Sequence, residues 1–320
     1  MSNAVIGIDI GGTNTVIGLV SHKGEILAQK HLETAKHSDF DLYIADVAQE
    51  VSALRTENPA VEVLGIGVGA PDGNYLTGAI EHAANLAWKG VVPIVEKLEA
   101  ATSLPVRLTN DANAAAVGEH LFGGAKGLKN FIIVTLGTGL GGGVYTRGEL
   151  LYGHSGHAGE LGHVNLYPNG RVCGCGARGC IETYVSATGI VRTATEIMSE
   201  YLTPSVLREI PLKDLTSKAI YDAALEGDFV AEEAFKRTSE YLGKAMSEIT
   251  TVLSPEKIFL FGGLAKAGEY LLAPARKSFE KNLMPMFQGH TTIELSQLPE
   301  GDAAVLGSAA VMWEAIDEEK

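Results

Sequence analysis

The sequence predicts an α/β protein built from two similar lobes that face a cleft. Its length of 320 residues suits about two domains. The first third alternates short β-branched runs with amphipathic segments, the pattern of strands and helices that share a sheet. The segment IGIDIGGTNTVIGLV at 6–20 is echoed by IIVTLGTGLGGGVY at 132–145, with Gly11 matching Gly137. A repeated strand, glycine turn and strand indicates a duplicated unit.

Each element of the first lobe follows from its residue pattern. Apolar runs predict strands at 5–10, 15–20, 26–31, 63–68 and 105–108. Apolar residues spaced three and four apart predict a helix over 40–54 that ends before Pro59. Further helices are predicted over 91–104 and over the alanine-rich 112–121.

The second lobe opens with the repeated strand, turn and strand. A loop-rich insert is predicted over 148–181, followed by helices, notably one over 230–253. A strand is predicted at 257–261, directly before Gly262 and Gly263, and a last helix over 303–316. From periodicity alone, this last helix could pack on either lobe.

Charge and composition limit the classes of partner. The chain has 25 basic and 39 acidic residues, a net charge of −14, which disfavours binding to nucleic acid or to an anionic membrane. The N-terminal residues lack the basic and long apolar regions of a signal peptide. We therefore expect a cytoplasmic protein with no nucleic-acid or membrane partner.

The glycines at 137–142 satisfy a dinucleotide-binding pattern, Gly137-x-Gly139-x-x-Gly142. That fold requires a helix to begin at the third glycine. Val144 and Tyr145 instead continue as a strand, so a nicotinamide-dependent oxidoreductase is disfavoured.

Three glycine-rich turns each follow an apolar strand: Gly11-Gly12-Thr13, Gly137-Thr138-Gly139 and Gly262-Gly263. Any one of them could be an ordinary tight turn. Together they favour backbone N–H groups and threonine hydroxyls that converge on phosphates. Asp9 ends the first strand, where it could hold Mg²⁺ or its water. The sequence thus predicts a nucleotide-binding cleft.

All three cysteines lie in one short motif, Cys173-x-Cys175-x4-Cys180. In a cytoplasmic chain such clustering favours a structural zinc site, although three buried free cysteines are the alternative. A closed tetrahedral site needs a fourth ligand, and histidine is a common one. His154, His157 and His163 are all near in sequence, and spacing alone does not choose among them.

Asn110 and Asp111 end a predicted strand and precede a helix. Either residue could simply be the N-cap of that helix. Both cannot fill the same cap, which leaves one of them for another role.

Four motifs together resemble the ROK family of sugar kinases and repressors: DIGGTN at 9–14, NDAN at 110–113, GELGH at 159–163 and CGCGARGCIE at 173–182. NLAWKG at 85–90 is similar to the glucokinase branch. The resemblance implies a two-lobed actin-like (ribonuclease H-like) fold with a zinc-binding loop insert, and sugar and ATP that meet between the lobes. It also implies that the last helix returns to the first lobe, giving a small lobe of 1–112 plus 303–320 and a larger one of 113–302.

The resemblance also assigns roles to residues. It makes Asp111 the general base and His163 the fourth zinc ligand beside Cys173, Cys175 and Cys180. It places sugar-binding groups at Gly69, Asn85, Asn110, Asp111, Glu160, His163 and Glu182. For ATP and Mg²⁺ the candidates are Asp9, Gly11, Gly12, Thr13, Thr138, Gly139, Gly262 and Gly263.

The function expected from these residues is ATP-dependent phosphorylation of a hexose, D-glucose to glucose 6-phosphate. The alternatives are a kinase of N-acetylglucosamine or N-acetylmannosamine and a sugar-responsive transcription regulator. A regulator would carry a DNA-binding domain ahead of Gly11, for which the sequence leaves no room, and the negative charge also disfavours it. The family resemblance implies a homodimer or homotetramer.

Overall fold

The computed structural model describes residues 2–299 and 301–319, and the chain forms two compact units. Unit 1 comprises Met1–Leu128, Gly143–Gly159 and Gln297–Lys320, and unit 2 comprises Lys129–Gly142 and Glu160–Ser296.

A five-stranded sheet with the order β3-β2-β1-β4-β8 forms the centre of unit 1. Its strands are β1 (Ser2–Ile10), β2 (Thr15–Ser21), β3 (Ile26–Leu32), β4 (Val61–Ala70) and β8 (Val106–Asn110). β1, β2 and β3 pair antiparallel, whereas β4 and β8 run parallel to β1. The five predicted strands are confirmed, and β4 and β8 each extend two residues further toward the candidate site.

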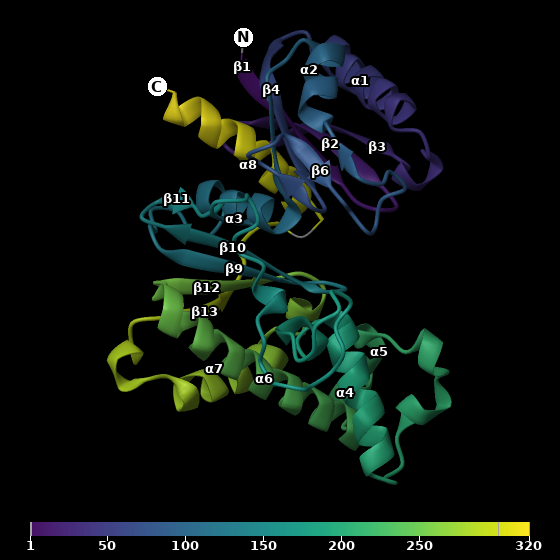
Figure 1. The fold of residues 1–320 in the computed structure, drawn as a ribbon, viewed down its shortest axis with the longest axis vertical. Helices are drawn as coiled ribbons and strands as arrows, with labels where there is room; N and C mark the ends of the chain where they lie inside the picture. The colour runs from purple at the N-terminus through teal and green to yellow at the C-terminus, as the bar shows by residue number, and fades with distance from the viewer. Residues whose placement is uncertain (1, 300, 320) are drawn as a thin grey trace. The chain divides into compact units, whose positions relative to one another are not determined.

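Alternating residues of β1 face two different helical layers. Ile6 and Ile8 are fully buried in a core that includes residues of α1 (Phe40–Glu57) and α2 (Ile94–Thr102). Val5 faces the opposite way, into a core that it shares with Val305 of α8 (Ala303–Glu318). The sheet therefore lies between α1 and α2 on one face and α8 on the other (Figure 1).

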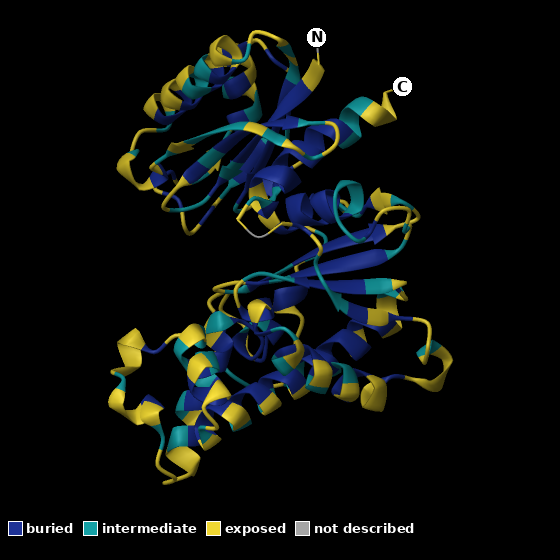
Figure 2. Ribbon diagram, turned by 180° about the vertical axis from the view of Figure 1, so that it is seen from behind, coloured by how far each residue is buried: buried dark blue, intermediate teal, exposed yellow. Residues whose placement is uncertain are grey.

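The close packing of α8 on the sheet depends on strand glycines. A Cβ added at Gly67 would lie 1.9 Å from the Ser308 carbonyl oxygen, a distance that no side chain could occupy. The central part of α8 is buried accordingly (Figure 2). α8 also packs against α3 (Asp111–Leu121), the helix that begins directly after β8.

A second five-stranded sheet has the order β11-β10-β9-β12-β13, which repeats the order of the first. Its strands are β9 (Phe131–Leu136), β10 (Leu140–Thr146), β11 (Glu149–Leu150), β12 (Lys257–Phe261) and β13 (Thr292–Leu295). β9, β12 and β13 run parallel, as do β1, β4 and β8. The predicted duplication is confirmed, and β10 is a strand where a dinucleotide fold would need a helix.

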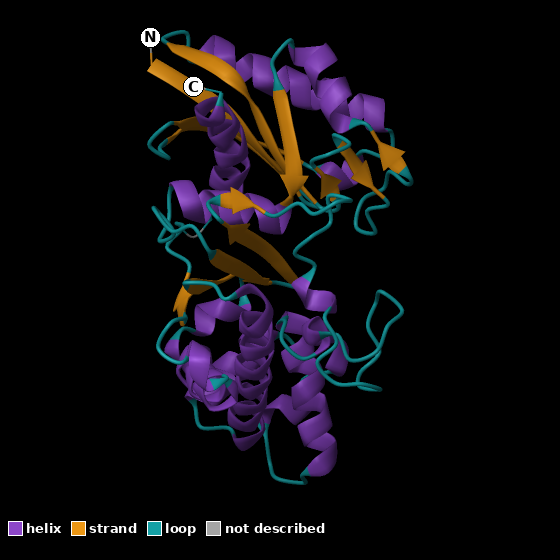
Figure 3. Ribbon diagram, turned by 60° about the vertical axis from the view of Figure 1, so that its left-hand side comes forward, coloured by secondary structure: helices purple, strands orange, loops and turns teal. Residues whose placement is uncertain are grey.

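Helices make up most of the remainder of unit 2. They are α4 (Ala187–Glu200), α5 (Ser217–Leu225), α6 (Phe229–Leu253) and α7 (Glu269–Asn282), with α6 and α7 side by side. The predicted insert, 148–181, of which the part up to Gly159 belongs to unit 1, consists largely of loops and turns, with short strand β11 and a 3₁₀ turn at Leu161–His163 (Figure 3).

One predicted helix differs from the structure in detail. The helix predicted over 91–104 is shorter, because Val91–Val92 form β7 and Pro93 caps α2 instead of lying inside it. β7 pairs with β6 (Ala79–Glu81), which pairs with β5 (Gly73–Asn74), in a small third sheet. The compact units also place α3 with the first sheet, because α3 packs on α8. The predicted lobe boundaries at 112 and 303 stay a prediction.

Among the described residues, the structure contains no helix long and apolar enough to span a bilayer.

Candidate functional site

The carboxyl ends of three parallel strands bring the first set of candidate residues together. Asp9 of β1 lies opposite Gly69 of β4, and Gly69 lies opposite Thr109 of β8. Asn110 and Asp111 follow Thr109 directly. Ligands of α/β proteins bind at this edge of a sheet, so unit 1 gathers Asp9, Gly69, Asn110 and Asp111 where a ligand is expected.

The turn after β1 lies at the same edge. The Gly11 nitrogen donates a hydrogen bond to the Asn14 carbonyl oxygen at 2.9 Å, which closes the turn. A Cβ added at Gly12 would lie 2.6 Å from the Asn85 carbonyl oxygen. The structure thus places Asn85, predicted from a separate motif, against the Gly11–Thr13 turn, with Thr13 and Asn85 both exposed.

Asn110 and Asp111 have different local roles. The Asn110 Oδ1 atom accepts a hydrogen bond from the Asn113 nitrogen at 2.7 Å, so Asn110 is the N-cap of α3. The N-cap interpretation is therefore correct for Asn110, and its amide nitrogen remains a potential donor to a ligand. Asp111 contacts the Ala112 nitrogen through Oδ1 at 2.8 Å, and its side chain is exposed. The cap does not require Asp111.

The carboxylates at this edge influence one another. Partial burial, together with the charge of Asp111, raises the pKa of Asp9 from 3.8 to about 6. The side chain of Asp111 reaches solvent but has protein atoms packed around it, and this desolvation raises the pKa of Asp111, with a smaller contribution from the charge of Asp72. A carboxyl group with a raised pKa is a stronger proton acceptor once it is ionised.

Sequence reasoning missed Asp72. It follows β4 in the turn Pro71-Asp72-Gly73 and has a left-handed φ of 52°. A charged residue after a buried strand was the available signal. Gly69 was predicted to lie on the sugar side of the site. In the structure it is buried in β4, where a Cβ would lie 2.8 Å from the Ser308 hydroxyl oxygen. Packing against α8 is its visible role, and contact with a sugar stays a prediction.

Two glycine turns of unit 2 lie at the carboxyl ends of adjacent strands. β9 and β12 are parallel, with Thr135 opposite Phe261, and the turns 137–139 and 262–263 follow them. Gly262 has a φ of 103°, and a Cβ there would lie 2.8 Å from the Leu136 carbonyl oxygen. Two of the three predicted phosphate-binding turns are therefore neighbours, with Thr138 and Gly263 exposed.

The start of α4 holds the 137–139 turn in place. The Ala187 nitrogen donates to the Gly137 carbonyl oxygen at 2.8 Å, and the Thr188 hydroxyl donates to the Thr138 carbonyl oxygen at 2.8 Å. Sequence reasoning did not find this support, because the contacting segments are far apart in the chain.

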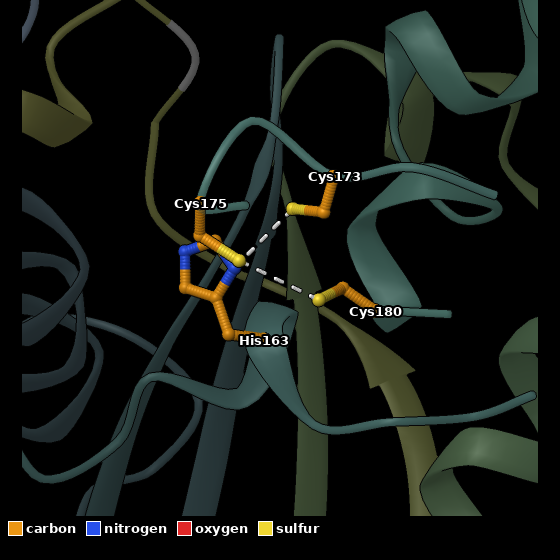
Figure 4. Close-up of side chains that lie close together, drawn as sticks. All are labelled: His163, Cys173, Cys175 and Cys180. Atoms are coloured by element: carbon orange, nitrogen blue, oxygen red, sulfur yellow. Dashed lines mark hydrogen bonds between the residues drawn. The ribbon is translucent and has the colours of Figure 1, made fainter. Parts of the chain in front are cut away.

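His163 and the three cysteines form one compact group, which we call the metal cluster (Figure 4). Their ligand atoms all lie within 4.8 Å of one another. The Cys175 and Cys180 sulfurs are 3.7 Å apart, and the Cys173 sulfur lies 3.6 Å from His163 Nδ1. Sulfurs bound tetrahedrally about 2.3 Å from one zinc ion would be about 3.8 Å apart. The donor set and its spacing therefore fit zinc.

The structure also shows which of the three candidate histidines lies beside the cysteines. His163 presents Nδ1 to the cysteines, which leaves Nε2 for another partner. His157 instead contacts Glu81 at 3.2 Å in unit 1. Among the described residues, only His163 joins the cysteines in such a group.

Arg171 anchors the cysteine loop to the rest of unit 2. Its guanidinium donates hydrogen bonds to the Thr183 and Gly189 carbonyl oxygens and pairs with Glu196 on α4. It also lies over the ring of Tyr184, 4.5 Å from the ring centroid. Only 7% of this side chain is exposed, so the arginine is structural and was not recognised as such from sequence.

The two remaining candidates, Glu160 and Glu182, lie close to the metal cluster. Glu160 and His163 stand at the two ends of the 3₁₀ turn, and the His163 nitrogen donates to the Glu160 carbonyl oxygen. Glu182 Oε1 lies 3.1 Å from the Cys173 sulfur and 3.9 Å from His163 Nδ1. Unit 2 therefore brings together Glu160, His163 and Glu182, while Asn110 and Asp111 belong to unit 1.

Comparison with known proteins now gives the family. The model of the ROK family matches residues 5–315. The chain belongs to the ROK family.

Two relatives within the ROK family are glucokinases. The glucokinase of Halalkalibacterium halodurans is 37% identical over 94% of this chain and 92% of that protein. The crystal structure of a ROK family glucokinase from Streptomyces griseus, in complex with glucose and AMPPNP, is 32% identical. It has a TM-score of 0.78 and covers 96% of this chain and 98% of that one.

The ROK family also includes regulators. The xylose repressor of Caldicellulosiruptor bescii is 28% identical over 97% of this chain and 78% of that protein. The predicted α/β fold class of two-lobed, actin-like sugar kinases is confirmed by these comparisons and by the two repeated sheets. The higher identity to glucokinases supports a sugar kinase.

Proposed function

We propose that this ROK protein is an ATP-dependent hexose kinase that converts D-glucose to glucose 6-phosphate, with Asp111 as the general base. The observation that carries the proposal is the position of Asp111. Its accessible carboxylate lies at the carboxyl edge of the first sheet, is not needed to cap α3, and has a raised pKa. The similarity to a glucokinase that binds glucose and AMPPNP supports the same function.

The reaction requires one proton acceptor. Asp111 takes the proton of the 6-hydroxyl as that oxygen attacks the γ-phosphorus of ATP. The new bond joins O6 to phosphorus, the bond between phosphorus and the β,γ-bridging oxygen breaks, and ADP leaves. Asp9 is the candidate ligand of Mg²⁺ or its water, and the cation offsets negative charge on the transferred phosphoryl group when bound.

The other predicted residues divide between the two substrates. Hexose hydroxyls are assigned to Asn85, Asn110, Glu160, His163 and Glu182, with Gly69 nearby. ATP phosphates are assigned to the turns of Gly11, Gly12 and Thr13, of Thr138 and Gly139, and of Gly262 and Gly263. Zinc on His163, Cys173, Cys175 and Cys180 orders the loop that presents the hexose ligands. We also propose a homodimer or homotetramer.

A substrate panel tests the proposal. D-glucose, D-mannose, N-acetylglucosamine and N-acetylmannosamine are assayed with ATP and Mg²⁺ by coupled detection of ADP. We expect the highest kcat/KM with glucose, because a site lined with polar groups favours a sugar with a hydroxyl on nearly every carbon. A higher kcat/KM with an N-acetylhexosamine would instead assign an amino-sugar kinase. Absence of phosphorylation of every sugar would favour a sugar-responsive regulator, as in the repressor relatives.

A further inference from the structure

The segment that follows Cys180 touches both the metal cluster and the 137–139 turn. Cys180 is a member of the cluster, and Glu182 comes two residues later. The main chain between them is fixed, because the Ile181 nitrogen donates to the Val164 carbonyl oxygen at 3.0 Å. Farther along, the Ala187 nitrogen and the Thr188 hydroxyl donate hydrogen bonds to the carbonyl oxygens of Gly137 and Thr138, respectively. A single stretch of chain therefore links the metal ligands to the turn.

The Glu182 carboxylate makes the shortest link between the two features. Its Oε2 atom accepts a hydrogen bond from the Leu140 nitrogen at 3.3 Å, at the end of the turn. Its Oε1 atom lies 3.1 Å from the Cys173 sulfur. The side chain is only 23% exposed. A zinc-bound Cys173 is a thiolate and has no proton to donate to Oε1, so the link depends on the Leu140 hydrogen bond and on the main chain that joins Cys180 to Glu182.

The turn joins the paired strands β9 and β10, and the Gly141 nitrogen donates to the Thr135 hydroxyl oxygen at 3.2 Å below it, so its two ends are fixed and its tip depends on other contacts. Gly137 and Thr138 are exposed, and glycines lose more conformational freedom on ordering than other residues. The hydrogen bonds described above for residues 137–140 all come from the segment 182–188. Displacement of that segment would therefore loosen the turn.

We propose that Glu182 is a positioning residue through which the metal cluster fixes the conformation of the 137–140 turn. Loss of the metal then weakens nucleotide binding as well as sugar binding. This inference rests on the proposed function only in naming a nucleotide as the ligand of the turn. Glu182 acts on that ligand through the Leu140 nitrogen and not by contact.

The experiment measures hydrogen exchange at the Leu140 amide and the Kd for AMPPNP without sugar, both on the full chain. The zinc-loaded parent is compared with Cys175→Ala, Glu182→Ala and Glu182→Gln. We expect exchange to be about tenfold faster and the Kd about tenfold higher in the two alanine variants, because a hydrogen bond to a charged acceptor is lost or displaced. Glu182→Gln should recover most of the protection, because its amide oxygen can still accept from Leu140.

Two glycine variants provide a matched pair that leaves the metal ligands intact. A Cβ at Gly139 would lie 2.4 Å from Glu182 Oε2, so Gly139→Ala should displace the carboxylate and speed exchange at Leu140 while zinc stays bound. A Cβ at Gly137 would meet no atom within 4 Å. The Leu140 amide of Gly137→Ala should therefore exchange at the same rate as in the parent.

Unchanged exchange at Leu140 after loss of the metal, or in Glu182→Ala, would overturn the proposal. So would equal effects of the two glycine variants. If the zinc-loaded parent neither binds AMPPNP nor phosphorylates any hexose, the proposed function fails, and the exchange comparison still decides whether the cluster controls the turn.

Discussion

Glu119 Oε1 accepts a hydrogen bond from the Gln297 nitrogen at 3.0 Å, across 178 positions of sequence. The same oxygen accepts a second bond from the Gly124 nitrogen at 2.8 Å. Glu119 is fully buried near the end of α3, and Gln297 begins the final segment of unit 1. One carboxylate thus joins the chain just after α3 to the segment that leads into α8.

We expect Glu119→Ala to lower the free energy of unfolding by about 2–4 kcal/mol, because two main-chain donors lose their acceptor in a buried setting. Urea denaturation measures the change. Glu119→Gln keeps one acceptor oxygen and should lower the free energy of unfolding by less than Glu119→Ala does. Glu96→Gln, at an exposed position on α2, is the control and should stay within about 0.5 kcal/mol of the parent. Equal stability of Glu119→Ala and the parent would contradict a structural role.

Asp111→Asn should lower kcat by roughly 10²–10⁴ while sugar affinity and fold are retained, because the amide keeps the shape but accepts no proton. Steady-state kinetics and a sugar titration by calorimetry give the two quantities. Asp214→Asn changes an exposed aspartate of unit 2 and should leave kcat unchanged. A near-normal kcat in Asp111→Asn would remove the general-base assignment.

Asp72→Asn should shift the acidic limb of the pH profile of kcat/KM to lower pH. The charge of Asp72 contributes to the raised pKa of Asp111, so its removal lowers that pKa and keeps Asp111 ionised in more acidic solution. Asparagine also tolerates the left-handed backbone at this position. An acidic limb that does not move, or that moves to higher pH, would show that Asp72 does not influence the base.

Asp9→Asn should abolish activity yet stabilise the protein above pH 6. The pKa of Asp9 is raised from 3.8 to about 6, so the folded state binds this proton more tightly than the unfolded state does. The stability that this proton gives is fully present below pH 3.8 and is lost as the pH rises through about 6. At pH 8 the variant should therefore gain about 1–3 kcal/mol over the parent.

Urea midpoints at pH 8 and near pH 3.8 measure the effect of Asp9→Asn. The two proteins should nearly converge at the lower pH, where Asp9 is protonated in the folded state and about half protonated in the unfolded state. A stability difference that does not depend on pH would contradict the shifted pKa.

The purified protein should contain about one zinc per chain, and Cys175→Ala should lose it. Loss of a ligand should lower the thermal midpoint and weaken sugar binding, because the metal orders the loop that carries Glu160 and Glu182. Elemental analysis, thermal unfolding and calorimetry give the three readouts. Protein prepared without chelator that contains no zinc would contradict the assignment.

Features encoded within a few residues were predictable from the sequence. The cysteine motif brings three ligands together by local turns, and family resemblance supplied His163. The repeated 6–20 and 132–145 segments predicted two sheets that have the same strand order. The sequence could not tell whether Asn110 or Asp111 is the cap of α3. The structure shows that Asn110 Oδ1 accepts the hydrogen bond from the Asn113 nitrogen, which leaves Asp111 as the candidate base.

Contacts between distant segments could not be predicted. Glu182 was recognised as a candidate hexose ligand, but its bond to the Leu140 nitrogen depends on how the insert packs against β10. Asp72 has a local signal, a charge directly after a buried strand, but its electrostatic effect on Asp111 leaves no pattern in the sequence. The later start of α2 could have been predicted from a local signal, because Pro93 lies inside the predicted helix and proline favours the start of a helix over its interior.

The glycines that let α8 lie against β1 and β4 also constrain synthesis of the protein. The ribosome releases the strands of the first sheet long before it makes α8, which supplies Val305, Leu306 and Trp313 to the core around Val5 and Val20. Unit 1 therefore cannot complete its core before residues 303–318 have left the ribosome. Until α8 has been made, the nascent sheet keeps one apolar face uncovered, and such a face is a surface that molecular chaperones can protect.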